Sequence, residues 1–410
     1  MEQQKEKLIL FVAYKKHMGG ELAPIEESME ELEELIDTAG GEVCTKFIQK
    51  VDAIHPAHYL GKGKIEELRL MIEQLGATGV VCDEELSPVQ MKNLAEMLDT
   101  KVLDRTIIIL HIFAERANSS EGKVQVEMAQ LKYQYSRLAG TGAMLSRQGG
   151  GIGAKGPGEK KLETDKRHIR ERMDILKQEI KEMEKHRDLL RKKRAKDNIP
   201  IVSIVGYTNS GKSTLLNTLS GSDVYAKDQL FATLDPTTRK VVLPEGTEIR
   251  LVDTVGFIRK LPHHLIKAFH STLEEAKYAD IILNVVDASS PNIDTHNDVV
   301  LSTLEKLGVK DIPIIEVFNK VDKIDYKPAG IGISAKNSIN LGELLTAIED
   351  ILYDEMKKFV ANIPYTDPKT LAYCKANAEK LEESYEEDGV KIQGYIHATK
   401  YHKIEPYVIV

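Results

Sequence analysis

The chain has 410 residues, of which 42% are hydrophobic, and a formal net charge of −8 at pH 7. This length predicts roughly two to four domains, and the acidic balance argues against a protein that coats nucleic acid over its whole surface, although a local basic patch is compatible with it. The three cysteines lie far apart and no apolar stretch reaches the roughly 18 residues of a membrane span, so we expect a cytoplasmic protein without a disulfide framework, signal peptide or membrane span.

Strand and helix signals alternate through residues 1–110. The expected strands are 7–14, 43–48, 79–82 and 101–103, and the expected helices are 23–39, 65–75 and 87–98. This alternation indicates a parallel α/β domain. The loop 58–64, with the sequence HYLGKGK, leaves two interpretations open. It is either an anion-binding nest of amide groups or a basic turn that caps the following helix.

Residues 111–196 are predicted to form a long antiparallel helical hairpin. Apolar residues recur at spacings of three and four in two segments, which are Val124, Met128, Leu131, Tyr135 and Leu138, and then Ile169, Met173, Leu176, Ile180 and Met183. Two such stripes joined by one connection are best buried against each other. The other faces of these helices carry many charges, which is typical of a solvated helix surface.

The predicted tip of this hairpin, residues 140–158, contains eight glycines, Arg147 and Lys155, and no acidic residue. A plain connection between helices needs only about two to eight residues. Small residues and cations can approach phosphate closely, so one interpretation is a probe that inserts into structured RNA. The other interpretation is a disordered linker.

The stretch 201–216, IVSIVGYTNSGKSTLL, has the order strand, G-x-x-x-x-G-K-S, helix. This is the context of a phosphate-binding loop, in which backbone amides at a helix N-terminus surround phosphate. Lys212 is expected to contact the β- and γ-phosphates, and Ser213 to ligate Mg²⁺. The expected phosphate contacts are Gly206, Tyr207, Thr208, Asn209, Ser210, Gly211, Lys212 and Ser213.

Two later motifs predict which nucleotide binds. The strand at 249–252 leads into Asp253, Thr254, Val255 and Gly256, a D-T-V-G motif whose carboxylate can hold the Mg²⁺ shell and whose glycine amide can sense the γ-phosphate. Its position in the chain, between the phosphate-binding loop and the motifs that follow, is the position expected in a GTPase.

The second motif follows the strand expected at 312–318. It is N-K-x-D, made by Asn319, Lys320, Val321 and Asp322. A carboxylate there can accept two adjacent N–H groups, which guanine presents and adenine does not. A further loop, expected to close over the base, contains Ser334, Ala335 and Lys336. The order of the motifs predicts a domain at 197–358 that binds GTP and GDP and hydrolyses GTP.

After an amphipathic helix at 341–356, the remaining residues 359–410 predict a small α+β domain. We expect a helix at 371–385 and strands at 390–399 and 407–410. His397 and His402 are interpreted as surface or core residues, since no partner at ligand spacing accompanies them. The predicted fold class is therefore α/β: a parallel α/β domain with a helical hairpin, then a P-loop GTPase domain, then this α+β domain.

The chain resembles the HflX family of translational GTPases from end to end, although the C-terminal part is much less specific. The motifs that carry the resemblance are YLGKGK at 59–64, DRT at 104–106, IFAERA at 112–117, QVEMAQL at 125–131, GGGIG with GPGE at 149–153 and 156–159, and FATLDPTTR at 231–239.

The resemblance implies that the N-terminal domain and arm dock on the large ribosomal subunit through rRNA, with the tip near the peptidyl-transferase centre. The GTP-bound protein would then split stalled or stress-arrested 70S ribosomes. The family has also been linked to RNA remodelling and to ATP binding by the N-terminal domain, for which 58–64 is a candidate contact. We expect a monomer.

The resemblance also assigns switch I, whose expected nucleotide contacts are Phe231, Ala232, Thr233, Leu234 and Asp235. It makes Thr233 the second Mg²⁺ ligand beside Ser213, whereas the residues alone leave Thr233, Thr237 and Thr238 open.

Phe257 occupies the position after D-T-V-G where many GTPases place a glutamine that orients water. No arginine stands out as a catalytic finger, although Arg239 and Arg259 flank the switches. We therefore expect slow intrinsic hydrolysis that the ribosome stimulates, with catalytic roles for Lys212, Thr233 and Asn209.

Asn209 is expected either to hold K⁺ between the phosphates or merely to shape the loop. An alternative function for the whole protein is a non-ribosomal signalling or scaffold switch, whose arm is a coiled coil that docks protein.

Overall fold

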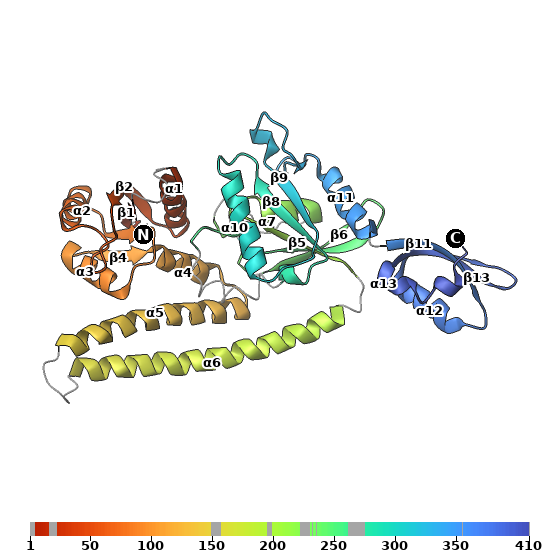
Figure 1. The fold of residues 1–410 in the computed structure, drawn as a ribbon, viewed down its shortest axis with the longest axis horizontal. Coiled ribbons are helices and arrows are strands. Elements are labelled where there is room, and N and C mark those ends of the chain that lie inside the picture. The colour runs from red at the N-terminus through yellow and green to blue at the C-terminus, as the bar shows by residue number, and fades with distance from the viewer. Residues whose placement is uncertain are drawn as a thin grey trace.

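Four parts follow one another along the chain (Figure 1): an N-terminal α/β domain, a helical hairpin, a P-loop domain and a small α+β domain. The expected fold class is thereby confirmed. The computed structural model describes residues 5–15, 23–148, 157–194, 199–221, 230–231, 233–234, 236–260, 275–354 and 356–409. Within these ranges, every helix is too short or too polar to cross a membrane.

The N-terminal domain is a sheet of parallel strands in the order β2-β1-β3-β4, with helices on both faces. Its elements are β1 (Lys7–Lys15), α1 (Ala23–Thr38), β2 (Glu42–Val51), α2 (Lys62–Leu75), β3 (Gly79–Cys82), α3 (Pro88–Leu98), β4 (Lys101–Asp104) and α4 (Arg105–Arg116). Alternate side chains of β1 enter different cores: Leu8 and Leu10 pack with α1 and α4, and Ile9 and Phe11 pack with α2 and α3. Burial of both faces explains why β1 reads as an unbroken apolar run.

The last three residues of the segment 58–64 lie in the first turn of α2. The amide groups of Tyr59 and Leu60 donate to carbonyl oxygens of the same loop. The amide group of Gly61 donates to the Gln49 side chain. These bonds and the helix start fit the interpretation as a basic turn at the start of α2, and the anion-binding nest stays a prediction.

The arm consists of α5 (Ser120–Gln148) and α6 (Pro157–Arg194), which run antiparallel below the N-terminal domain in Figure 1. One face of α5 meets α6, where Leu176 is fully buried and Arg172 forms an ion pair with Glu127. Another face of α5 is buried by the N-terminal domain, through Ala129 and Tyr133 among others. The apolar residues of α5 therefore serve two contacts: one with α6, as expected from the sequence, and one with the N-terminal domain.

The tip is shorter than the sequence predicts. Residues 140–148 continue α5, and α6 begins at Pro157, so only 149–156 connects the helices. This connection is within the ordinary range of about two to eight residues. Its length therefore gives no argument for a function. The connection itself, which includes Lys155, lies outside the described residues.

The P-loop domain contains a six-stranded sheet in the order β10-β9-β8-β5-β7-β6, in which β6 alone runs antiparallel to its neighbour. Its elements are β5 (Ile201–Gly206), α7 (Lys212–Ser220), β6 (Thr237–Val242), β7 (Glu248–Asp253), β8 (Ile281–Asp287), α10 (Ile293–Lys306), β9 (Ile314–Asn319), β10 (Ile331–Gly332) and α11 (Leu341–Asp354). The motif-bearing strands β5, β7 and β9 end at the same edge of this sheet, which brings their following loops together.

The C-terminal domain differs from the sequence-based expectation. It contains β11 (Met356–Pro364), α12 (Pro368–Asn377), β12 (Ala378–Tyr385), β13 (Gly389–His397) and α13 (Ala398–Tyr401). The helix expected to reach residue 385 ends at Asn377, because the following residues pair with β13 as a strand. The strand expected at 407–410 is also wrong, since Glu405–Tyr407 forms a 3₁₀ turn and only Val408 makes an isolated bridge.

Two expected domain boundaries fall inside single elements. The boundary after residue 110 cuts α4, and the boundary after residue 358 cuts β11. α4 belongs with the N-terminal sheet because Ile108, Ile109 and Phe113 are buried in its core. The arm therefore begins at α5 rather than at residue 111.

One apolar cluster joins the N-terminal domain to the P-loop domain. It includes Ile109 and Phe113 of α4 together with Phe231, Val255 and Phe257 of the P-loop domain. The Phe113 and Phe231 rings meet edge to face, with centroids 4.6 Å apart. The two domains thus share a core that includes Phe231 of the expected switch I and Val255 and Phe257 in and after the D-T-V-G motif.

Candidate nucleotide-binding site

The loop between β5 and α7 requires glycine at two positions. Gly206 has φ +150°, and a Cβ atom there would lie 2.3 Å from the Val285 carbonyl oxygen. Gly211 has φ +94°, and a Cβ atom there would lie 2.2 Å from Asn319 Nδ2. Both contacts are far too close for any side chain, so the G-x-x-x-x-G spacing follows from packing against β8 and β9. The loop ends at the N-terminus of α7, where unpaired helix amides favour anions.

Lys212 is buried at the start of α7, and its Nζ atom donates to the Tyr207 carbonyl oxygen at 2.6 Å. Burial lowers the pKa of Lys212 to about 8, and the nearby Asp253 carboxylate opposes this shift. The ammonium group is therefore still mainly protonated at pH 7. A phosphate in the loop would supply the counter-charge that this buried cation needs.

Three oxygen-bearing side chains meet beside Lys212. Ser213 Oγ lies 2.7 Å from Thr233 Oγ1 and donates to Asp253 Oδ2 at 2.9 Å. The other carboxylate oxygen, Asp253 Oδ1, is buried and has no hydrogen-bond partner among the described residues. Burial raises the pKa of Asp253, while the Lys212 charge and the two hydroxyls oppose this. Two hydroxyls backed by a buried carboxylate fit a hard cation such as Mg²⁺.

The N-K-x-D segment is tied to the phosphate loop by hydrogen bonds. Asn319 Nδ2 donates to the Ser210 carbonyl oxygen at 2.8 Å, and its Oδ1 accepts from the Ala335 amide at 2.9 Å. Lys320 Nζ donates to the Asn209 carbonyl oxygen at 2.8 Å. These bonds join the phosphate loop, the N-K-x-D segment and the loop 334–336 into one continuous wall of the expected nucleotide site.

Asp322 is exposed at the rim of this wall. A hydrogen bond from the Ser334 side chain is the largest cause that lowers the pKa of Asp322, so its carboxylate is ionised at neutral pH. An ionised, accessible carboxylate can accept two adjacent N–H groups of a purine. The geometry therefore suits guanine recognition.

A cavity of about 430 Å³ lies between these segments. Its lining residues are Thr208, Asn209, Gly211, Lys212, Ser213, Thr214, Phe231, Thr233, Thr254, Gly256, Asn319, Lys320, Asp322, Lys323, Ser334 and Lys336. Sequence reasoning did not select Thr214 and Lys323. Each directly follows a selected motif, and that adjacency is the signal that could have found them.

Other expected contacts lie behind the cavity wall rather than on it. These are Gly206, Tyr207, Ser210, Leu234, Asp253, Val255, Val321 and Ala335. Some act on the wall through other groups, as Asp253 does through Ser213. Two more expected contacts, Ala232 and Asp235, lie outside the described residues.

Phe257 is buried and pairs with the phosphate loop through its backbone. Its amide donates to the Gly206 carbonyl oxygen at 3.1 Å, and its carbonyl oxygen accepts from the Thr208 amide at 2.8 Å. The preceding residue, Gly256, has no room for a side chain, since a Cβ atom would lie 2.9 Å from Lys212 Nζ. The segment after D-T-V-G is thus held closely against the phosphate loop.

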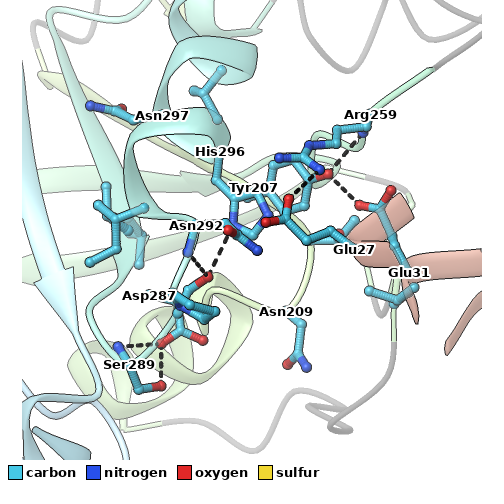
Figure 2. A pocket seen from close by; sticks show the side chains of 18 of the residues that line it. Glu27, Glu31, Tyr207, Asn209, Arg259, Asp287, Ser289, Asn292, His296 and Asn297 are labelled. Atoms are coloured by element: carbon cyan, nitrogen blue, oxygen red, sulfur yellow. Dashed lines mark hydrogen bonds and ion pairs between the residues drawn. The ribbon is translucent and has the colours of Figure 1, made fainter. Parts of the chain in front are cut away.

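Neither of the two arginines that flank the switches lines the cavity of about 430 Å³. Arg239 is on β6, and one of its guanidinium nitrogens donates to the Thr238 carbonyl oxygen. Arg259 pairs with Glu27 of α1 at 2.8 Å. It lines a separate cavity of about 260 Å³ between α1 and the P-loop domain, which Asn209 and Tyr207 also line (Figure 2). In this arrangement neither arginine acts as a finger on the phosphates.

Three family models match the chain between residues 26 and 320, with short gaps between them. Residues 26–114 match a family described as GTP-binding GTPase N-terminal, residues 116–194 a GTP-binding GTPase middle region, and residues 201–320 a 50S ribosome-binding GTPase. Among solved structures, a GTP-binding protein of Sulfolobus solfataricus in complex with GDP is 25% identical. That match covers 85% of this chain and 99% of that chain with a TM-score of 0.44.

Full-length relatives are closer. The chain is 50% identical over 388 residues to GTPase HflX of Caldanaerobacter subterraneus, covering 94% of this chain and 91% of the relative. It is 40% identical over 349 residues to GTPase HflX of Escherichia coli, covering 82% of each. The chain therefore belongs to the HflX family and is a GTPase.

Proposed function

We propose that this GTPase acts on the ribosome: with GTP bound, it docks its N-terminal domain and arm on the large subunit and splits stalled or stress-arrested 70S ribosomes. The observation that carries the proposal is the placement of the arm. The end of α5 and the start of α6 stand at one extreme of the molecule, far from the P-loop domain (Figure 1). The sequence between them is rich in glycine and free of acidic residues, which suits contact with rRNA phosphates.

The match of residues 201–320 to ribosome-binding GTPases supports the ribosomal partner over a protein-docking scaffold switch. We place this activity in the cytoplasm, where ribosomes are, and expect a monomer to carry it.

GTP would lie in the cavity of about 430 Å³. In this proposal the loop 206–213 surrounds the phosphates, and Asp322 accepts the two guanine N–H groups. Asn319 positions the loop rather than the base, since both ends of its amide are bonded to the backbone. Residues 334–336 close over the base.

Ser213 and Thr233 would hold Mg²⁺, with Asp253 orienting Ser213. The cation would neutralise charge on the β- and γ-phosphates. Lys212 would bind the same phosphates, and the Gly256 amide would donate to the γ-phosphate.

Intrinsic hydrolysis would be slow because the residue after Gly256 cannot orient water. Phe257 is apolar and buried, and its backbone is bonded to the phosphate loop. Other GTPases gain about 10⁵-fold when a partner supplies the missing groups or orders the switches. In this proposal the ribosome repositions residues 256–260, which are otherwise held against the phosphate loop.

Replacing residues 141–157 with a short Gly-Ser link tests the ribosomal function. We expect the intact chain to sediment with large subunits in the presence of a non-hydrolysable GTP analogue, and to convert 70S particles into subunits on a sucrose gradient. The altered chain should lose both, because the rRNA contacts leave with the tip. Equal binding of the two proteins would overturn the role of the tip. No binding by either would overturn the ribosomal function.

Asp322→Asn should weaken GDP binding by roughly 100-fold or more, since an amide cannot accept both guanine N–H groups and leaves one unpaired. Xanthine nucleotides, which present an oxygen at that edge, should bind the variant better than guanine nucleotides. Titration with fluorescent nucleotides measures both. Asp325→Asn is the matched control, because it removes the same charge from an exposed residue three positions away. Unchanged guanine affinity in Asp322→Asn would contradict the assignment.

Gly256→Ala should lower GTP turnover by at least about 100-fold, the cost of losing one donor to a developing charge. The added methyl group would contact Lys212 Nζ and Thr208 and push the amide away from the γ-phosphate. GDP affinity should fall by much less, because GDP lacks that phosphate and keeps only the β-phosphate that Lys212 contacts. Gly342→Ala is the control, since a Cβ atom there meets nothing within 4 Å. Normal turnover in Gly256→Ala would show that this amide does not act in hydrolysis.

Asn209 supports a further element of the proposal, a K⁺ ion between the phosphates. Its φ of +60° is uncommon for a residue other than glycine, and it lines both cavities. Ribosome-stimulated turnover in KCl should then exceed that in NaCl at equal ionic strength, and Asn209→Ala should remove the difference. Equal rates in the two salts would leave Asn209 with only the role of shaping the loop.

A further inference from the structure

A buried polar network connects the N-terminal domain to the P-loop domain, and its centre is Arg105 at the start of α4. This guanidinium group is 2% exposed. It donates to Asp83 Oδ1 at 2.9 Å and to the Ser28 carbonyl oxygen at 3.3 Å, and it also pairs with Glu31. Burying charges is costly unless each is paired, and an α/β domain of this size does not need them for its core.

Both acidic partners of Arg105 reach the P-loop domain. Glu31 accepts a hydrogen bond from the hydroxyl of Tyr207 in the phosphate loop. Asp83 pairs with Lys260, which lies four residues after Gly256. The network therefore contacts the phosphate loop and the segment after D-T-V-G at the same time.

Tyr207 links these two segments directly. Its hydroxyl accepts a hydrogen bond from the Arg259 amide at 2.9 Å, and its ring stacks on His296 with centroids 3.9 Å apart. The Arg259 side chain pairs in turn with Glu27 of α1 at 2.8 Å. Figure 2 shows Glu27 and Glu31 pointing from α1 towards Tyr207 and Arg259.

Asp104, the residue before Arg105, connects the same point of the chain to the arm. Its Oδ2 atom accepts from the Tyr133 hydroxyl at 3.0 Å and from Arg137 at 2.7 Å, and both of these residues are on α5. Asp104 is fully buried and also caps α4 through the Ile107 amide. A displacement of α5 would therefore move the start of α4, and Arg105 with it.

α4 also contacts the other side of the nucleotide cavity. Phe113, two turns along this helix, packs against Phe231. Phe231 lines the cavity and lies two residues before Thr233. One helix thus touches the segments on both sides of the expected γ-phosphate position, and its first residue is bonded to the partners of the phosphate loop.

We propose that Arg105 is a positioning residue for GTP hydrolysis, through which the arm and the segment 256–260 are coupled. GTP draws the Gly256 amide towards the γ-phosphate. Lys260 transmits this change to Asp83, and the Arg259 amide transmits it through the Tyr207 hydroxyl to Glu31. Arg105 and Asp104 pass it to α5. By linkage, if GTP binding changes the affinity of the arm for a partner, then binding of that partner changes the affinity of the protein for GTP by the same factor.

Hydrogen exchange on the protein without ribosomes tests the coupling alone. Amides of α5 between residues 124 and 138 should exchange at different rates with GDP and with a non-hydrolysable GTP analogue, by roughly 5-fold or more. Arg105→Gln should abolish this difference while GDP affinity stays within about 2-fold of the original. Arg105→Lys should keep part of it, because one ion pair can re-form.

Arg172→Gln is the matched control, since it removes an exposed ion pair with Glu127 between α5 and α6 and should keep the full difference. Tyr207→Phe removes the hydroxyl that joins Glu31 to the Arg259 amide. It should reduce the difference without abolishing it, because the pairs of Asp83 with Lys260 and Arg105 remain. If the Arg105 variants do not fold, the result for Tyr207→Phe decides whether this network couples the nucleotide to the arm. The proposal is overturned if the original protein shows no nucleotide-dependent difference, or if Tyr207→Phe keeps all of it.

A second experiment rests on the proposed ribosomal function. Arg105→Gln should still sediment with large subunits, but the stimulation of its GTP turnover by ribosomes should fall by roughly 10-fold or more, because the segment 256–260 loses its alignment with the γ-phosphate. Full stimulation in this variant would overturn the coupling and leave the ribosomal function intact. If the unaltered chain does not bind ribosomes, the ribosomal function fails, and the exchange experiment still judges the coupling.

Discussion

Two close approaches of the backbone hold the nucleotide cavity together. The loop after β5 touches β8 at Gly206 and the Asn319 side chain at Gly211, at distances that exclude any Cβ atom. Asn319 then bonds to both the phosphate loop and the loop after β10. The phosphate loop, Asn319 and the loop after β10 are therefore held in one arrangement relative to one another, which is what preorganisation of a site requires.

This dependence on local contacts explains how much of the site could be predicted from the sequence. A phosphate-binding loop needs glycines at set positions, and N-K-x-D needs the end of a strand, so a few adjacent residues specify most of the geometry. The parallel strands of the N-terminal domain were equally predictable from the sequence, because burial on both faces produces unbroken apolar runs such as β1. In both cases the short-range pattern and the final fold agree.

The errors arise where distant contacts override the local pattern. Residues 378–385 are rich in helix formers, yet pairing with β13 makes them a strand. Gly140 and Gly142 suggested the end of a helix, although a helical glycine costs only roughly 1 kcal/mol. α5, with its 29 residues, continues through both of them.

The interface between the first domain and the P-loop domain lay beyond prediction for the same reason. Glu31 and Tyr207 are 176 positions apart, and nothing in the spacing of either indicates the other. The apolar part of this interface, around Phe113 and Phe231, is non-directional and would tolerate sliding. The buried pairs of Arg105, Asp83 and Glu31 are directional, and they fix the orientation of one domain on the other. Because Asp83 also pairs with Lys260, and Glu31 bonds to the Tyr207 hydroxyl that accepts from the Arg259 amide, the orientation of the domains is coupled to the position of the segment after Gly256.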